Sequence, residues 1–166
     1  PATGIWEDRT PPVTDPDSWP VARFGVRFVY EPVTERFIMF SGVGVFGERF
    51  TPTFYEDTWA YDPVSNQWED LTDLEAAHPI GRTTYGMAWD AASRRVMLFA
   101  GDSLSGTDDD HLWAFDPETA SWEDLGVSEM GPIDRWYHLL TSDPQSGRLV
   151  MIGGTGSILT PIQGGS

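Results

Sequence analysis

The chain has 166 residues, 40% of them hydrophobic and 13% aromatic, which is enough for one globular domain with a buried core. Its 26 acidic residues against 10 lysines and arginines give a net charge of −16, and this balance excludes nucleic acid as a partner. No cysteine is present, so disulfides and thiol nucleophiles are excluded, and no apolar run reaches the ~18 residues that membrane insertion requires.

The pattern of apolar runs and turn residues predicts a chain built only from short strands. The first expected strand lies within residues 4–10 and stands alone. Two units of four strands follow, at 23–30, 36–42, 57–61 and 68–71, and then at 82–90, 95–101, 111–115 and 122–125. A third unit has two strands, at 135–141 and 148–154, and a tail at 155–166 where the pattern fades. Asp-Pro pairs and glycines between the runs favour tight turns.

These units repeat one sequence. RFIMFSG and, after a loop, DTWAYDPVSNQWEDL recur as RVMLFAG and HLWAFDPETASWEDL. The first phrase appears again as RLVMIGG, and the last phrase appears ahead of the first unit as GIWEDRT. Tryptophans recur at fixed positions of the repeat, so they are expected to fill the space between sheets. A period of about 50 residues with four short strands is typical of a propeller blade.

Three features of the repeat resemble the kelch family. They are the glycine pair after the second strand, the Trp-x-[Tyr/Phe]-Asp sequence of the third strand, and the tryptophan of the fourth strand. The pair is Gly153–Gly154, reduced to Ser41–Gly42 and Ala100–Gly101. The resemblance covers residues 4–154 and implies an all-β fold of four-stranded antiparallel blades, usually about six or seven around a channel. One departure is His111, which stands where the first unit has Asp57.

The number of strands is a second departure, because three blades cannot close a ring. An open end leaves unpaired backbone groups that favour pairing with another chain. We therefore expect residues 1–166 to form a half-propeller domain that a second copy completes. The strand at 4–10 of one chain would pair beside the C-terminal strands of its partner in a six-bladed homodimer. A head-to-tail filament would form if the angle per blade does not close, and the alternative is a piece of a longer kelch protein.

An arginine opens the first strand of each unit, at Arg23, Arg82 and Arg135. That strand is innermost in a propeller, so these arginines would surround the channel mouth. The position three residues later varies and includes Tyr85 and His138. One interpretation is a ligand-binding mouth for an anion or carboxylate, since a guanidinium offers a planar fork of donors. The alternative is structural, with each arginine donating to a backbone carbonyl or to an acid of the third strand.

The loop at 101–111 is the densest acidic stretch of the chain. Asp102, Asp108, Asp109 and Asp110 could supply oxygen ligands to calcium, which is the one candidate cofactor. The spacing matches no EF-hand loop, and such a charge run is also typical of a solvated loop. We predict no catalytic residues, because no nucleophile or histidine pair stands at a spacing that would build a site.

Two functions follow from these patterns. The first is a non-enzymatic binding or structural module that assembles with itself and offers its loops to a glycan or a protein. The second is a carbohydrate-active enzyme, of epimerase, mutarotase or lyase type, with its site at the channel mouth. A copper-radical oxidase of the galactose-oxidase type is excluded, since it needs a cysteine. A secreted location, extracellular or periplasmic, is preferred, although a cysteine-free chain suits any redox compartment.

Overall fold

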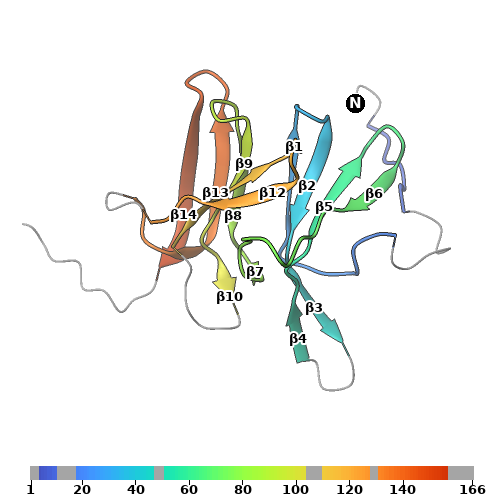
Figure 1. Ribbon diagram of the computed structural model, residues 1–166, viewed down its shortest axis with the longest axis horizontal. Coiled ribbons are helices and arrows are strands. Elements are labelled where there is room, and N and C mark those ends of the chain that lie inside the picture. Colours follow the sequence, from blue (N-terminus) through green and yellow to red (C-terminus); the bar gives the residue numbers. More distant parts are fainter. Residues whose placement is uncertain (1–3, 11–17, 47–50, 104–109, 128–130, 157–166) are drawn as a thin grey trace, which may run out of the picture.

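The computed structural model describes residues 4–10, 18–46, 51–103, 110–127 and 131–156 (Figure 1). All regular structure in these residues is β-strand, and every strand pairing is antiparallel. The all-β prediction is therefore confirmed. Since the described part of the chain holds no helix, it holds none that could cross a membrane.

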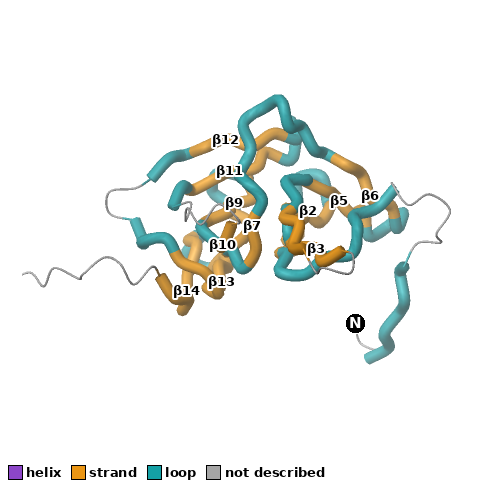
Figure 2. The backbone as a smooth tube through the Cα atoms, turned by 90° about the horizontal axis from the view of Figure 1, so that it is seen from below, coloured by secondary structure: helices purple, strands orange, loops and turns teal. Residues whose placement is uncertain are grey.

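Two four-stranded sheets and one long hairpin form the body of the molecule (Figures 1 and 2). Sheet I has the order β1 (Arg27–Glu31), β2 (Arg36–Phe40), β5 (Thr58–Asp62) and β6 (Gln67–Asp70). Sheet II repeats it with β8 (Gly86–Asp90), β9 (Arg95–Phe99), β11 (Leu112–Asp116) and β12 (Ser121–Asp124). Hairpin III consists of β13 (Arg135–Asp143) and β14 (Arg148–Gly156). Sheet II lies between the other two, so the three units stand in one row.

The core lies between sheets I and II. Ile38 and Phe40 from β2 face Val96 and Leu98 from β9, and all four are fully buried. Both strands are nearly continuous apolar runs, as expected of strands covered on two faces. The repeat therefore places its most apolar strand at the centre of each sheet.

The tight turns are held by side chains that cap the backbone. Asp62, for example, accepts hydrogen bonds from the Val64 amide at 2.7 Å and from the Ser65 hydroxyl at 2.6 Å. These bonds lower the pKa of Asp62, because they favour the charged carboxylate. Asp143 caps the turn of hairpin III in the same way. Several of the recurring acids therefore have a role in turn formation.

Two details differ from the predicted strands. The expected loop after β2 is a hairpin of β3 (Val43–Phe46) and β4 (Thr51–Phe54), which projects from the lower side of sheet I in Figure 1. The expected strand at 82–90 is divided, because Thr84 has a φ of 56°. Its first part, β7 (Arg82–Thr83), pairs with β10 (Asp102–Ser103) rather than continuing into β8.

The positive φ at Thr84 recurs in every unit, although β13 continues through it, and it accompanies a link between neighbouring sheets. The equivalent residues Gly25 and Tyr137 have φ values of 74° and 60°. The Thr84 amide donates to the Gly25 carbonyl at 3.3 Å, and the Tyr137 amide donates to the Thr84 carbonyl at 3.0 Å. A left-handed residue at this position thus turns a backbone amide toward the preceding sheet.

The glycine pair after the second strand also has a structural cause. Its second member has a positive φ in all three units, at Gly42 (99°), Gly101 (109°) and Gly154 (85°). A Cβ at Gly101 would lie 2.7 Å from the Cβ of Tyr85 and 2.8 Å from the Thr83 carbonyl oxygen. The first member also has a positive φ, but Ser41 and Ala100 fit there. The close approach explains why only the second glycine is kept in every unit.

The N-terminal segment at 4–10 forms no strand within this chain. Ile5 is 75% exposed and Trp6 is 98% exposed, so neither side chain packs on the body of the molecule. The segment at 4–10 is expected to be the fourth strand of a blade, and for this it would have to pair with a sheet of another chain. This expectation stays a prediction.

Candidate functional site

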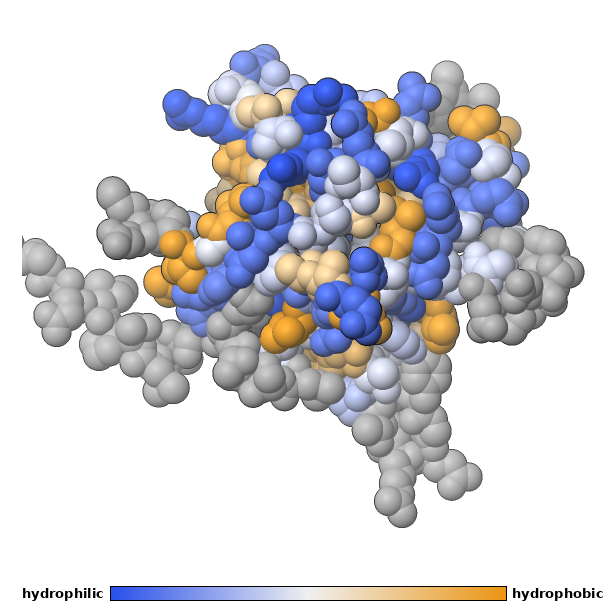
Figure 3. Space-filling model, viewed as in Figure 1, coloured by the Kyte–Doolittle hydropathy of each residue, from blue (hydrophilic) through white to orange (hydrophobic). Residues whose placement is uncertain are grey.

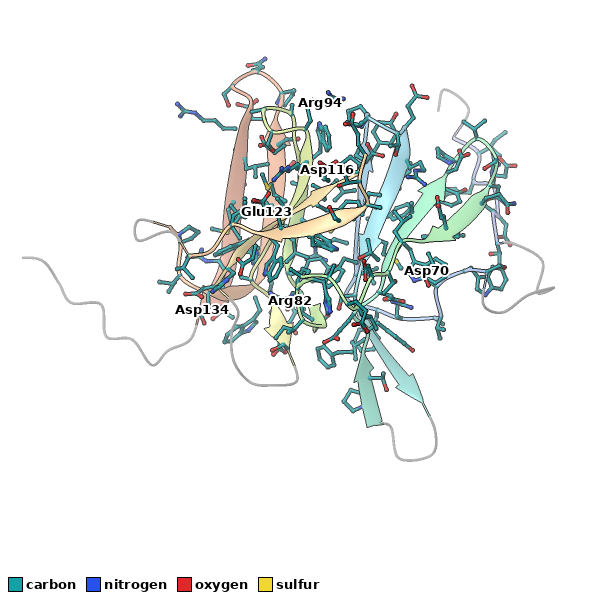
Figure 4. All side chains as sticks on the ribbon, in the orientation of Figure 1. Asp70, Arg82, Arg94, Asp116, Glu123 and Asp134 are labelled. Carbon is teal, nitrogen blue, oxygen red and sulfur yellow. The ribbon has the colours of Figure 1, made fainter. Side chains whose placement is uncertain are left out.

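The three arginines of the repeat take one common position. In each of Arg23, Arg82 and Arg135, Nε donates to the carbonyl two residues earlier and Nη1 donates to the carbonyl 18 residues later, at 2.8 to 3.3 Å. Arg82 is 1% exposed and is the first residue of β7, between sheets I and II (Figure 4). The guanidinium therefore ties the start of the unit to the end of its second strand.

Arg23 has an acidic partner as well. Its Nη2 lies 2.8 Å from Oδ2 of Asp57, and its guanidinium lies 3.9 Å from the centre of the Tyr55 ring. His111 replaces the aspartate in the second unit and turns instead to Asp124, with 2.8 Å between Nδ1 and each carboxylate oxygen. The departure from the repeat at position 111 is thus matched by a local contact between His111 and Asp124.

Tyr85 joins sheet II to sheet I. Its hydroxyl accepts a hydrogen bond from the Arg27 amide at 3.0 Å and donates to the Phe40 carbonyl. The side chain is fully buried, and burial raises the pKa of the phenol far above its usual value. The hydroxyl therefore stays protonated and acts as a fixed link between the two sheets.

His138 holds the equivalent place between hairpin III and sheet II. It is fully buried, its ring meets the ring of Phe99 edge to face at 5.9 Å, and a Cβ at Gly86 would lie 2.3 Å from Nε2. Neither ring nitrogen has a hydrogen-bond partner among the described residues. Burial lowers the pKa of His138, the charges of Arg135 and Arg27 lower it further, and nearby carbonyls oppose the shift more weakly.

The low pKa of His138 predicts a pH-dependent stability. The unfolded chain binds a proton at this residue near pH 6.5, whereas the folded chain does so only at lower pH, so the free energy of unfolding should fall as the pH drops below about 6.5. We expect the change between pH 7.5 and 5.5, measured by urea unfolding, to be smaller in His138→Leu than in the natural chain. An equal change in both proteins would contradict the assignment.

The predicted calcium ligands are only partly described. Asp102 is exposed on β10, Asp110 lines an apolar pocket, and Asp108 and Asp109 lie outside the described residues. Within the described ranges, no group of three or more His, Asp or Glu side chains could hold a metal ion. Calcium binding by the loop at 101–111 stays a prediction.

An aromatic face lies on sheet I, opposite the core. We call it face A and define it by Phe28, Tyr30, Phe37, Tyr61 and Trp68. The rings of Phe28 and Phe37 stack at 4.7 Å, and those of Tyr61 and Trp68 lie 5.0 Å apart. Phe28 is 45% exposed and Tyr30 is 44% exposed. The outer side of the first sheet is thus a packed and partly exposed aromatic surface, with a pocket at one side that Thr10 and Trp19 also line.

A second uncovered apolar face lies at the other end of the row. We call it face B and define it by Tyr137, Leu139, Val150 and Ile152 on hairpin III. Leu139 is 62% exposed and Ile152 is 61% exposed. Apolar side chains reach the surface on the left of the molecule in Figure 3, the side on which Figure 1 places β14. Strand alternation puts His138 toward sheet II and these residues away from it.

The individual side chains of faces A and B were not identified from the sequence. Alternation along β1, with aromatic rings at positions 28 and 30, was the available signal for face A. Face B carried a weaker signal, because apolar residues stand on both sides of β14. The sequence predicted that the row of sheets has an open end on each side. It did not predict which side chains form the surface at each end.

No family model matches the chain, so the kelch resemblance rests on the repeat alone. Among solved structures, the chain is similar to one titled "Structure of YjhT", with a TM-score of 0.57 and 14% sequence identity. The match covers 73% of this chain and 41% of that one, so the chain spans less than half of its length. At this identity the likeness supports the fold and says nothing about activity.

Proposed function

We propose that the chain is a non-enzymatic structural or binding module that assembles with a second copy into a closed β-propeller. Sheets I and II would be kelch-type blades, and hairpin III would be the inner half of a third blade. Face A of one copy would pack on face B of the other at two junctions related by a two-fold axis. The observation that carries the proposal is a difference in side-chain exposure. Residues at equivalent repeat positions are buried inside the row of sheets and exposed at its ends.

Phe28 and Met87 hold the same position in their units. Phe28 at the open end is 45% exposed, whereas Met87 beside sheet I is 3% exposed. Ile152 and Phe99 form a second such pair, at 61% and 7% exposed. Covering one large apolar side chain stabilises an interface by about 1.5–3 kcal/mol. The ends of the row therefore have the composition of a junction between sheets and lack only the neighbouring sheet.

The outer edge of β14 supports the same proposal. In sheets I and II, the second strand pairs on both sides, with β1 and β5 or with β8 and β11. Among the described residues, β14 pairs only with β13. Its other edge is nine residues long and offers unpaired backbone groups to an added strand.

A ligand role at the channel mouth is less well supported. Arg82, Tyr85 and His138 are buried, and Arg82 and Tyr85 bind backbone groups of the scaffold. Their contacts favour the structural interpretation of the arginine row over a carbohydrate-active enzyme. The proposed module would also bind a glycan or a protein through its surface loops, and we name no residues for that binding.

The proposal predicts that a charge on face B prevents assembly. Leu139→Glu should convert the dimer to a folded single chain, because an uncompensated carboxylate cannot be buried in an apolar junction. Leu74→Glu is the matched control, since Leu74 is 60% exposed and lies outside faces A and B. Sedimentation equilibrium measures the masses. An unchanged dimer in Leu139→Glu would remove face B from the interface.

A further inference from the structure

The junction between sheets I and II includes a partly buried tryptophan from the fourth strand, Trp122, which packs against the core. Trp122, on the fourth strand of sheet II, packs against the ring of Phe40 at 5.2 Å and the ring of Phe115 at 5.1 Å. Its indole Nε1 donates to the Thr58 hydroxyl at 2.9 Å. The fourth strand thus reaches across to the preceding sheet and anchors its tryptophan there.

The corresponding place one unit later is an apolar pocket. It lies between sheet II and hairpin III, and its cavity volume is about 370 Å³. Its lining includes Phe99, Leu112, Leu125, Leu140 and Met151. Phe99 and Leu112 hold the repeat positions of Phe40 and Thr58. An engineered cavity of about 150 Å³ takes benzene, so this pocket has room for an indole.

Trp6 fits this pocket by its position in the repeat. The sequence IWED at 5–8 aligns with QWED at 67–70 and SWED at 121–124, which makes Trp6 equivalent to Trp122. Trp6 is 98% exposed. The following residues Arg9 and Thr10 lie beside Trp68 on sheet I, at the opposite end of the row from the pocket (Figures 1 and 2). The pocket therefore suits the Trp6 of another copy.

A charge pair points to the same partner. The arginine that opens the second strand pairs with the glutamate of the fourth strand in both complete sheets, as Arg36 with Glu69 and Arg95 with Glu123. The third arginine of this series, Arg148, has no acidic partner among the described residues. Glu7 is the remaining glutamate of the series. In the single chain its carboxylate forms an exposed ion pair with Arg9 at 3.1 Å, and a solvent-exposed pair of this kind is weak enough to be replaced.

We propose that Trp6 of one copy occupies the pocket between sheet II and hairpin III of the other copy, with its Glu7 paired to the partner's arginine at position 148. This inference rests on the proposed self-assembly. It identifies the N-terminal segment and the pocket through which the two copies would bind each other. Leu112 cannot accept a hydrogen bond as Thr58 does, so the carboxylate of Asp110, which also lines the pocket, is the acceptor available to the indole N–H.

Trp6→Ala in the full chain is the first test. We expect dimer dissociation at concentrations at least about thirtyfold above those of the natural chain, because a central tryptophan is typically a binding hot spot. The matched control is Ile5→Ser. The equivalent residues Gln67 and Ser121 are exposed, and serine is the natural residue at position 121, so serine should be tolerated at position 5. Trp6 is exposed in the single chain, so thermal unfolding of the dissociated protein should be unchanged.

Charge exchange is the second test, and it reports the register. Glu7→Arg alone and Arg148→Glu alone should each weaken the dimer, because each places like charges together at both junctions. An equimolar mixture of the two variants should form mixed dimers at least about threefold in excess over either variant dimer, since every junction then has opposite charges. Native mass spectrometry resolves the species after labelling one variant with ¹⁵N.

The outcomes separate the inference from the proposed function. A natural chain that stays single would overturn both. If Leu139→Glu abolishes the dimer but Trp6→Ala leaves it unchanged, the proposed dimer is supported and the binding of Trp6 in the pocket is overturned. Random mixing of the charge variants would overturn the pairing of residues 7 and 148. Loss of the dimer in Trp6→Ala, with Ile5→Ser unaffected and mixed dimers in excess, supports the whole inference.

Discussion

Replacing Tyr85 by alanine is expected to lower the free energy of unfolding by about 4 kcal/mol, close to the largest effect of any side chain in the protein. The change opens a cavity between sheets I and II and removes the hydroxyl that links them. It leaves the Phe40 carbonyl and the Arg27 amide without this partner. Urea unfolding at one fixed protein concentration measures the effect, because a dimer's stability depends on concentration.

A second substitution separates the hydroxyl from the ring. Tyr85→Phe keeps the packing and should cost about 1–3 kcal/mol, the usual penalty for buried polar groups left unpaired. Tyr30→Phe is the control, since Tyr30 is 44% exposed in the single chain. Both variants are compared in the Leu139→Glu background, in which the proposed assembly is lost and face A is not covered by a partner. Equal effects of the two phenylalanine variants would show that the hydroxyl of Tyr85 does not join the sheets.

Gly101→Ala should destabilise the protein by about 3 kcal/mol. Its φ of 109° is unfavourable for any residue with a Cβ, and the added atom would meet the Tyr85 Cβ at 2.7 Å and a backbone oxygen at 2.8 Å. The backbone oxygen belongs to a paired strand, so the clash cannot be relieved by a side-chain rotation. Differential scanning calorimetry measures the shift in Tm.

Gly147→Ala is the matched control for this clash. Gly147 has a φ of 68°, and a Cβ there would have no atom within 4 Å. Only backbone strain remains, so the expected loss is about 1–2 kcal/mol. A loss at Gly101 no greater than at Gly147 would mean that the close approach to Tyr85 is not what requires glycine at position 101.

The strands could be predicted because their signals are local. Apolar runs, Asp-Pro turns and recurring tryptophans placed the strands of sheets I and II within a few residues of their observed bounds. The repeat also indicated a shared role for Arg23, Arg82 and Arg135, and their backbone hydrogen bonds agree with its structural interpretation. Because the same local pattern occurs three times, such features can be recognised in a single sequence.

Other features depend on contacts between units and were not predicted. The break at Thr84 accompanies a hydrogen bond from the Thr84 amide to the carbonyl of Gly25, which lies in the preceding unit. Thr84 has a Cβ, so its positive φ has no sequence signal of the kind that glycine gives. The hairpin of β3 and β4 lies where a loop was predicted, because the sequence at 43–54 carries no strong strand pattern. Faces A and B are surfaces that no sheet within the described residues covers. Periodicity along a strand does not reveal which sheets lie next to one another.

The mass of the particle in solution tests the assembly most directly. Size-exclusion chromatography with multi-angle light scattering on the full chain should give one species at twice the chain mass of 18.5 kDa over a wide range of concentrations. A folded species at the mass of one chain, even at high concentration, would contradict the pairing of faces A and B. A series of larger masses would contradict a closed ring of two copies.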